Sequence, residues 1–284
     1  MLKMKLFVPA TMGLLMVAGV AMAQPGHEGH NHGTPPTADA IHEHTQGKTV
    51  FELNGIKLTT VEGSPDFPSA ELKLKSPANG AVVAEGKVLF QYDVKNYDLK
   101  KQTGDHQHCA NSAQGQHIHL ILNNEPYVAL YNDTFSKDLK PGGYVALSFL
   151  SRSYHESVKH KAAYTLQYFS VGTKAVKNEV DLKAPAIFYS RPKGDYKGSE
   201  ETTHVLLDYF LVNCTLSKEG YKVKATIDGT EFTLTKWEPY FVDGLALGKH
   251  TIKLELIDKA GKTVKNKFNP VERSINLLPA DPAK

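Results

Sequence analysis

Histidine and cysteine side chains that could bind a metal ion are concentrated in the middle of the chain. Of the thirteen histidines, six lie between His106 and His160, and five lie between His27 and His44. A segment of fourteen residues has the spacing His-x-His-Cys-x7-His-x-His. Imidazole and thiolate are ligands for zinc and copper, and three or four of them complete a closed site. The candidate ligands in this segment are His106, His108, Cys109, His117 and His119.

His117 and His119 lie in HIHLIL (117 to 122), a segment typical of a β-strand. Side chains two residues apart on a strand point to the same face, so one metal ion could bridge this pair. A matching segment later in the chain has Val223 at the position of Ile118, and we therefore expect Ile118 to face the core. The two imidazoles are then expected to face outward, into a loop or solvent, where they contribute little packing.

The segment SRSYHESVKH (151 to 160) could bring His155 to the same end of the fold as a further ligand. It also favours a second kind of site, in which the planar guanidinium of Arg152 binds a carboxylate or phosphate while Glu156 and His155 complete a polar pocket. The alternative is a loop held by an Arg-Glu surface pair that contributes little to stability.

The elements that must position these residues are strands. After residue 50, short segments alternate apolar and polar residues, are rich in Tyr, Phe, Val, Ile and Thr, and follow one another too closely for intervening helices. An all-β architecture is therefore predicted. The clearest segments are KVLFQYDV (87 to 94), HIHLIL (117 to 122), YVALSFL (144 to 150), AYTLQYFSV (163 to 171), THVLLDYFLV (203 to 212) and HTIKLELI (250 to 257).

An internal repeat indicates two such domains. Residues 76 to 99 align with residues 190 to 216, so that Asn96 falls on Asn213. Each copy spans about a hundred residues, the size of an immunoglobulin-like domain. We predict two tandem immunoglobulin-like or fibronectin-like β-sandwiches, at 70–172 and 182–278.

The first copy contains an insert that the second lacks. Where the second copy has TLSKEG after Asn213-Cys214, the first has DLKKQTGDHQHCANSAQG after Asn96-Tyr97. The second domain is expected to fold without such a segment, so a sandwich does not require it. The insert carries His106, His108 and Cys109.

The first 69 residues are expected to precede both domains. Residues 1–23 combine two lysines, an uncharged apolar run and a final Ala-Met-Ala, the pattern of a cleaved signal peptide. Residues 24–48 are rich in Gly, Pro, His and Thr, which predicts a disordered tail whose histidines bind copper, zinc or nickel weakly. Residues 49–69 predict a β-hairpin around Asn54-Gly55, followed by a linker.

Composition narrows the partners and the location. The chain has 33 Lys and Arg against 30 Asp and Glu, a net charge of +3, and no basic cluster, which argues against nucleic acid. No stretch after the signal has the roughly eighteen apolar residues of a membrane span. No cysteine follows the cleavage site for lipid attachment. A periplasmic or secreted protein is predicted.

The two cysteines, Cys109 and Cys214, are too few for a disulfide scaffold. An oxidising compartment favours a bridge between them. The repeat, however, puts them in different domains, and a bridge needs α-carbons within about 7 Å. Free thiols are therefore expected, which leaves Cys109 available as a ligand.

Three motifs resemble a class of bacterial extracytoplasmic proteins with immunoglobulin-like domains. These are the Gly-x-His-x-His-Leu strand at Gly115 to Leu120, a Pro-Gly-x-Tyr motif at Pro141 to Tyr144, and Ser-Arg-x-Tyr-His-Glu-Ser at Ser151 to Ser157. The resemblance covers about a third of the chain, the first predicted domain. It implies a fold and an extracytoplasmic location and carries no settled activity.

The His-x-His strand is also similar to that of copper-zinc superoxide dismutases. Their later Gly-x-His-x-Asn-Pro loop has no counterpart here, so dismutase activity is not favoured. Other enzyme signatures are lacking too, including Gly-x-Ser-x-Gly and His-Glu-x-x-His.

The sequence therefore predicts a periplasmic protein, not an enzyme, that binds copper or zinc in its first sandwich. His117 and His119 would be the strand-borne pair, His106, His108 and Cys109 would close the site, and His155 would be an additional ligand. The alternative is a structural or adhesive module that binds a cell-envelope protein or glycan, with Trp237 as a contact residue unless it is core. A metal-assisted enzyme with Glu156 as base is the third hypothesis.

Overall fold

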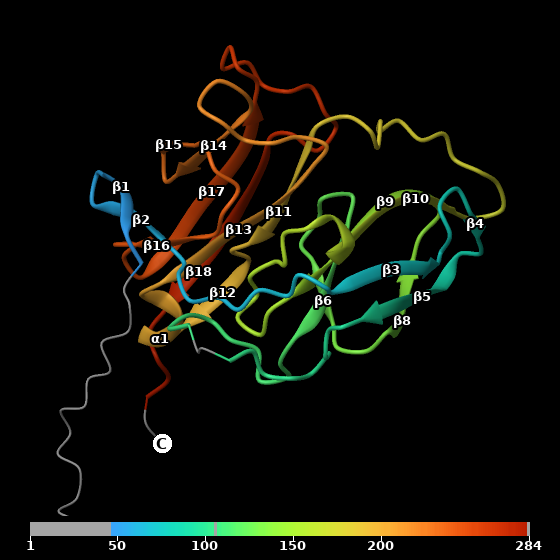
Figure 1. Cartoon of the computed structure of the whole chain (residues 1–284), viewed down its shortest axis with the longest axis horizontal. Coiled ribbons are helices and arrows are strands. Elements are labelled where there is room, and N and C mark those ends of the chain that lie inside the picture. The colour runs from blue at the N-terminus through green and yellow to red at the C-terminus, as the bar shows by residue number, and fades with distance from the viewer. Residues whose placement is uncertain (1–46, 105–106, 283–284) are drawn as a thin grey trace, which may run out of the picture. The chain divides into compact units, whose positions relative to one another are not determined.

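The computed structural model describes residues 47–104 and 107–282, and this part of the chain is built almost entirely of β-strands (Figure 1). Its only helical elements are the short 3-10 turn η1 (Lys161–Ala163) and the single-turn α1 (Ser199–Thr202). The predicted all-β class is confirmed. No helix in the described residues is long and apolar enough to cross a membrane.

The first sandwich has two sheets facing each other across one core. One sheet has the order β3-β5-β8 and the other β4-β10-β9-β6-β7. The apolar side chains of alternate positions, such as Phe90, Ile118, Leu120 and Phe169, fill the space between them. The strands are β3 (Glu71–Ser76), β4 (Val82–Val83), β5 (Gly86–Lys95), β6 (His117–Leu122), β7 (Val128–Leu130), β8 (Thr134–Leu139), β9 (Gly142–Ser151) and β10 (Tyr164–Val171).

The second sandwich repeats this strand order. The set β11-β13-β16 corresponds to β3-β5-β8, and β12-β18-β17-β14-β15 corresponds to β4-β10-β9-β6-β7. In both, a short strand pairs in parallel with the last strand. This is an immunoglobulin-like, fibronectin-like topology. The strands are β11 (Ala186–Arg191), β12 (Gly194–Lys197), β13 (Val205–Val212), β14 (Lys222–Ile227), β15 (Thr230–Leu234), β16 (Tyr240–Asp243), β17 (Gly248–Ile257) and β18 (Val271–Leu278).

Two asparagines at equivalent strand ends illustrate the correspondence. Asn96 follows β5 and Asn213 follows β13, and both have a positive φ, 54° and 56°. Each side-chain amide donates to backbone carbonyls: Asn96 to Ser69, and Asn213 to Leu182 and Ala184. Asparagine tolerates the left-handed conformation better than most residues, which explains why the alignment finds the same residue at both turns.

The N-terminal hairpin joins the second sandwich. β1 (Thr49–Leu53) and β2 (Ile56–Thr60) are connected at Asn54-Gly55, both with positive φ, as a tight hairpin turn requires. β2 pairs antiparallel with β16 and extends that sheet to five strands. Ile56 and Leu58 of β2 are buried in the second core.

A third apolar cluster lies between the two sandwiches. Side chains on the outer face of β6 and β9 pack against side chains of β11 and β13, with a stack of Phe149 on Phe210 at 4.7 Å. All six residues of β6 are consequently buried, whereas its counterpart β14 alternates buried and half-buried residues. The outer face of β6, which carries His117 and His119, is therefore covered by protein.

Candidate metal centre

Three imidazoles converge between the sandwiches: His117 and His119 of β6 and His155 of the β9–β10 loop. The Nε2 atoms of His117 and His119 are 2.9 Å apart, and Nδ1 of His155 is 3.1 Å from Nε2 of His117. One candidate ligand atom from each residue lies within 4.8 Å of the others. In the described part of the chain, this is the group of His, Cys, Asp and Glu side chains that could hold a metal ion.

The orientation of β6 is partly as expected. Ile118 faces the core, as predicted, and the two imidazoles lie on the opposite face. They do not face solvent, because the second sandwich covers them and both are completely buried. The expectation that they contribute little packing is therefore wrong. The two rings are buried because the sandwiches contact each other, and the pattern of a single strand does not reveal that contact.

Hydrogen bonds on the far side of each ring orient the pair. Nδ1 of His117 lies 2.8 Å from the carbonyl oxygen of Gly115, which can only accept. The proton of His117 is therefore on Nδ1, and its Nε2 presents a lone pair to the other two rings. Nδ1 of His119 lies 3.2 Å from the hydroxyl of Ser190, which can donate or accept. Such partners on the second ring nitrogen are characteristic of metal-binding histidines.

Gly115 is suited to its role for a steric reason. Its φ is +80°, and an added Cβ would lie 2.5 Å from the carbonyl oxygen of Lys100. Only glycine fits this position without displacing the backbone. The Gly115 carbonyl is thereby held where it can accept from His117.

His155 reaches the pair from a constrained loop. Its φ is +70°, a conformation uncommon for residues with a side chain. The backbone N–H of His155 donates to Arg152, and the N–H of Arg152 donates to Glu156, which closes the turn. Tyr127 contacts two of the three imidazoles. Its ring stacks on His119 with centroids 3.5 Å apart, and its hydroxyl lies 3.3 Å from Nδ1 of His155.

The environment keeps all three imidazoles neutral. Burial, together with the nearby cations Arg191 and Lys193, lowers the pKa of His117 to about 4, although its bond to Gly115 opposes this. Burial likewise holds the pKa of His119 and His155 well below the usual range for histidine. Because imidazole must be neutral to bind a metal, the ligands are ready at neutral pH.

Two of the three candidate ligands in the insert, His108 and Cys109, lie among the described residues but do not belong to the group of three histidines. Cys109 is buried but lies outside the group of three histidines. Burial raises the pKa of its thiol to about 12, so the sulfur is protonated at neutral pH. His108 is likewise outside the group, and His106 lies outside the described residues. Both cysteines are free thiols, as Cys214 is also unbridged.

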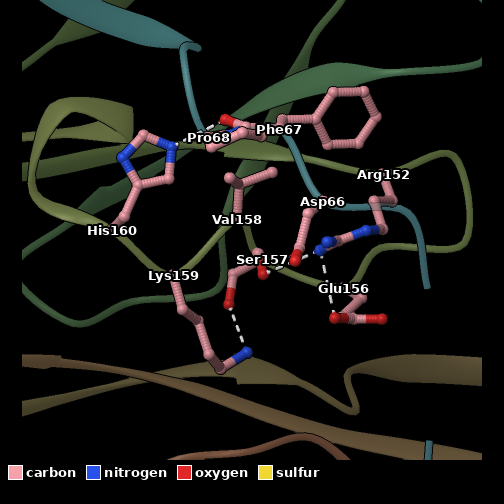
Figure 2. Close-up of a pocket in the computed structure, with 9 residues that line it drawn as sticks. All are labelled: Asp66, Phe67, Pro68, Arg152, Glu156, Ser157, Val158, Lys159 and His160. Carbon is pink, nitrogen blue, oxygen red and sulfur yellow. Dashed lines mark hydrogen bonds and ion pairs between the residues drawn. The ribbon is translucent and has the colours of Figure 1, made fainter. Parts of the chain in front are cut away.

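Arg152 and Glu156 form a buried ion pair at 3.0 Å. The remaining guanidinium hydrogen bonds go to the carbonyls of Pro65 and Ser157, and Glu156 also accepts from Ser64. A pocket of about 420 Å³ lies beside this pair. Figure 2 shows the pair together with Phe67 and His160, which also line the pocket. The arginine fork is thus occupied by protein acceptors that fasten residues 64–67 to the loop carrying His155.

Several residues around the three histidines are not predicted by the ligand motifs of the sequence. Ser190, Arg191 and Lys193 come from the second sandwich, and Tyr127 follows the turn after β6. None belongs to a ligand motif, and residues 71 positions apart, such as His119 and Ser190, meet only through the packing of the domains. Trp237 is half-buried against the second core and the contact between sandwiches, and donates to the carbonyl of Tyr209.

Comparison with known proteins identifies no relative by sequence: no protein-family model and no curated protein matches the chain. Solved structures with a similar arrangement include fibronectin(III)-like modules of Clostridium thermocellum CbhA, at 12% identity and a TM-score of 0.27, covering 75% of this chain and 97% of that one. The central fibronectin-III array of RIM-binding protein matches at 8% identity and a TM-score of 0.25, covering 79% and 73%. Bacteroides ovatus SGBP-B, solved with a mixed-linkage heptasaccharide, matches at 10% identity and a TM-score of 0.22, covering 74% and 71%. At such TM-scores the fold assignment rests on the strand order described above.

Proposed function

We propose that this protein is a periplasmic or secreted transition-metal binding protein that holds copper or zinc with His117, His119 and His155. The observation that carries the proposal is the convergence of the three rings on the bare Nε2 of His117, at 2.9 Å from one and 3.1 Å from the other. Each far-side nitrogen of the strand pair has a fixed partner, which leaves the near-side nitrogens directed at one point.

The spacing of these nitrogens suits a metal ion. An ion about 2.0 Å from each of three imidazole nitrogens spaces them about 3.3–3.5 Å apart. The two distances from Nε2 of His117, 2.9 and 3.1 Å, need to open by a few tenths of an ångström. The distance between the ligand atoms of His119 and His155, which lie within 4.8 Å of each other, must adjust to the same spacing through movement of the β9–β10 loop. Ser190 can adapt to the change of tautomer that metal binding imposes on His119, since its hydroxyl accepts as readily as it donates.

The N-terminal segments extend the proposal beyond the described residues. The signal peptide would bring the protein to an extracytoplasmic compartment, where metal ions enter the cell envelope. The histidines of the 24–48 tail would act as a weak capture arm that raises the local concentration of the ion, as flexible His-rich segments can. The buried centre would then be the tight site.

Metal titration of the full chain tests the proposal, with the five tail histidines (His27, His30, His32, His42 and His44) changed to glutamine to remove weak binding. In this background we expect one ion per chain. His117→Asn keeps an amide donor for the Gly115 carbonyl but removes the ligand nitrogen, and it should reduce affinity by at least a hundredfold.

His204→Asn is the matched control. Its Nδ1 bonds Asp243 at 2.6 Å, so asparagine preserves the equivalent donor there too, at a site away from the three histidines. This variant should bind metal like its parent. If His117→Asn binds as tightly as the parent, or if the parent binds no ion, the assignment is refuted, and the adhesive alternative becomes the better hypothesis.

A further inference from the structure

Two cations stand close to the three histidines. Lys193 lies 3.8 Å from the centroid of the Tyr127 ring, while His119 stacks on that ring at 3.5 Å. The distance from the Lys193 ammonium to the centroid of the His119 ring is therefore at most the sum of these two distances. Arg191 lies 5.5 Å from the same ring and is buried. Arg191 also follows Ser190, whose hydroxyl lies 3.2 Å from Nδ1 of His119, so both cations stand beside the same rings.

No carboxylate in the described ranges 47–104 and 107–282 forms an ion pair with either of these positive charges. Lys193 donates to the carbonyl of Tyr127 and Arg191 to the hydroxyl of Tyr196, both neutral acceptors. Nε of Arg191 is buried with no hydrogen-bond partner. Glu156, which follows His155 directly in sequence, is already paired with Arg152.

The centre also offers few ligands. Three imidazoles make up the group in the described part of the chain, and neither a carboxylate nor a cysteine belongs to it. His117 and His119 are completely buried, and His155 is 8% exposed. A zinc ion takes a fourth ligand, which must be water or an anion when the protein supplies three. A monovalent d10 ion is stable with two or three nitrogen ligands.

We infer that this centre selects a soft monovalent cation, copper(I), over divalent zinc or copper(II). The inference rests on the proposed function and specifies which ionic charge the site prefers. Three neutral ligands in a buried site contribute no negative charge, so the Coulomb repulsion from Arg191 and Lys193 opposes a dication twice as strongly as a monocation. Three-coordination in a water-poor site favours the monovalent ion for a second, independent reason.

Removal of one cation gives a quantitative test. The full chain with its five tail histidines changed to glutamine is titrated with copper(I) under ascorbate, with silver(I) as a redox-silent probe, and with zinc(II). Lys193→Gln removes the charge and keeps a donor for Tyr127. Because Coulomb energy scales with the charge of the ion, the affinity should rise about tenfold for silver(I) and about a hundredfold for zinc(II).

The controls separate this inference from the proposed function. Lys57→Gln removes one exposed lysine from the N-terminal hairpin and should change neither the affinity for silver(I) nor the affinity for zinc(II). In the parent, copper(I) and silver(I) should bind at least a hundredfold more tightly than zinc(II). Zinc binding as tight as silver binding, or equal gains for both ions in Lys193→Gln, overturns the preference for a monovalent ion. Failure of His117→Asn to reduce the binding of either ion refutes the metal site itself.

Discussion

At the scale of single residues, the depressed pKa values of the buried histidines predict an acid-sensitive fold. The pKa of His117 is about 4 in the folded protein and about 6.5 when exposed. Between these values the unfolded chain binds more protons, so stability is full above about pH 6.5 and falls as the pH drops toward 4. For His117 alone, the loss between pH 7 and pH 5 is on the order of 2 kcal/mol. Urea unfolding of the metal-free protein at pH 7 and pH 5 measures it.

Two variants test whether the acid sensitivity comes from His117. His117→Asn should show a shallower loss of stability with acid than the parent. The pKa of His204 is instead raised by its hydrogen bond to Asp243, so its contribution is present at low pH and is lost as the pH rises. His204→Asn should therefore steepen the acid loss. Equal slopes for the parent and His117→Asn would contradict the burial of this imidazole.

Cys109 supports a second prediction at this scale. With a thiol pKa of about 12, it should react with iodoacetamide at neutral pH only after unfolding. Cys109→Ser should leave the affinity for copper and zinc unchanged, since the thiol lies outside the group of three histidines. Alkylation is followed by mass spectrometry, and affinity by titration. A large loss of affinity in Cys109→Ser would return the cysteine to the ligand set.

The sequence identifies three of the clustered side chains but not their surroundings. The His-x-His spacing on a strand is sufficient to predict that His117 and His119 share a face. His155 is predicted because its loop follows a strand that ends near the same edge. The position of Cys109 outside the group of three histidines and the nearness of Arg191 and Lys193 both depend on tertiary packing, which local spacing does not determine.

At the scale of elements, the β9–β10 loop determines where His155 lies. Arg152 and Glu156 are 4% and 6% exposed and pair within this loop, while Arg152 also holds the Pro65 carbonyl. Glu156→Gln leaves the guanidinium buried without its counter-ion, which typically costs about 3–5 kcal/mol. We expect lower stability and weaker metal binding, although all three imidazoles remain. Unfolding and metal titration measure the two effects.

The exposed pair of Lys267 and Glu179 serves as a control for this change. Both side chains are largely exposed, so Glu179→Gln should alter neither stability nor metal affinity. A Glu156→Gln variant with parental stability and affinity would show that the buried pair is not needed to position the loop.

The strands themselves follow well from the sequence, because alternation and β-branched residues predict each half-buried strand directly. β14 shows this alternation as buried and half-buried positions. β6 fits the same pattern in its core-facing residues, yet its outer face is buried as well. The difference arises from a partner surface more than sixty residues away in sequence, on β11 and β13, which the periodicity of one strand cannot encode.

At the scale of the whole molecule, the contact between sandwiches creates the centre. Asn124, in the turn after β6, donates to the carbonyls of Ile187 and Phe268 and accepts from the backbone of Tyr189. His119 reaches Ser190 across the same contact. Two domains of one topology therefore differ in function through their mutual packing as well as through the insert. The repeat predicts the domains, but the surface by which they associate is revealed only by the structure.

The contact between the sandwiches also contains a buried ion pair, and its removal tests how the domains are coupled. Lys159 of the β9–β10 loop pairs with Asp208 of β13, whose carboxylate is fully buried and also accepts from Ser157. Lys159→Met leaves that carboxylate unpaired and should cost about 3–5 kcal/mol. Lys159→Met combined with Asp208→Asn should cost less than the sum of the single changes, because the partners interact directly.

Hydrogen exchange of Lys159→Met should show lost protection on β6, β9, β11 and β13. Lys57→Met on the exposed hairpin should leave the protection of these strands unchanged. Additive costs, or exchange confined to the loop, would mean that the two sandwiches associate independently of this pair.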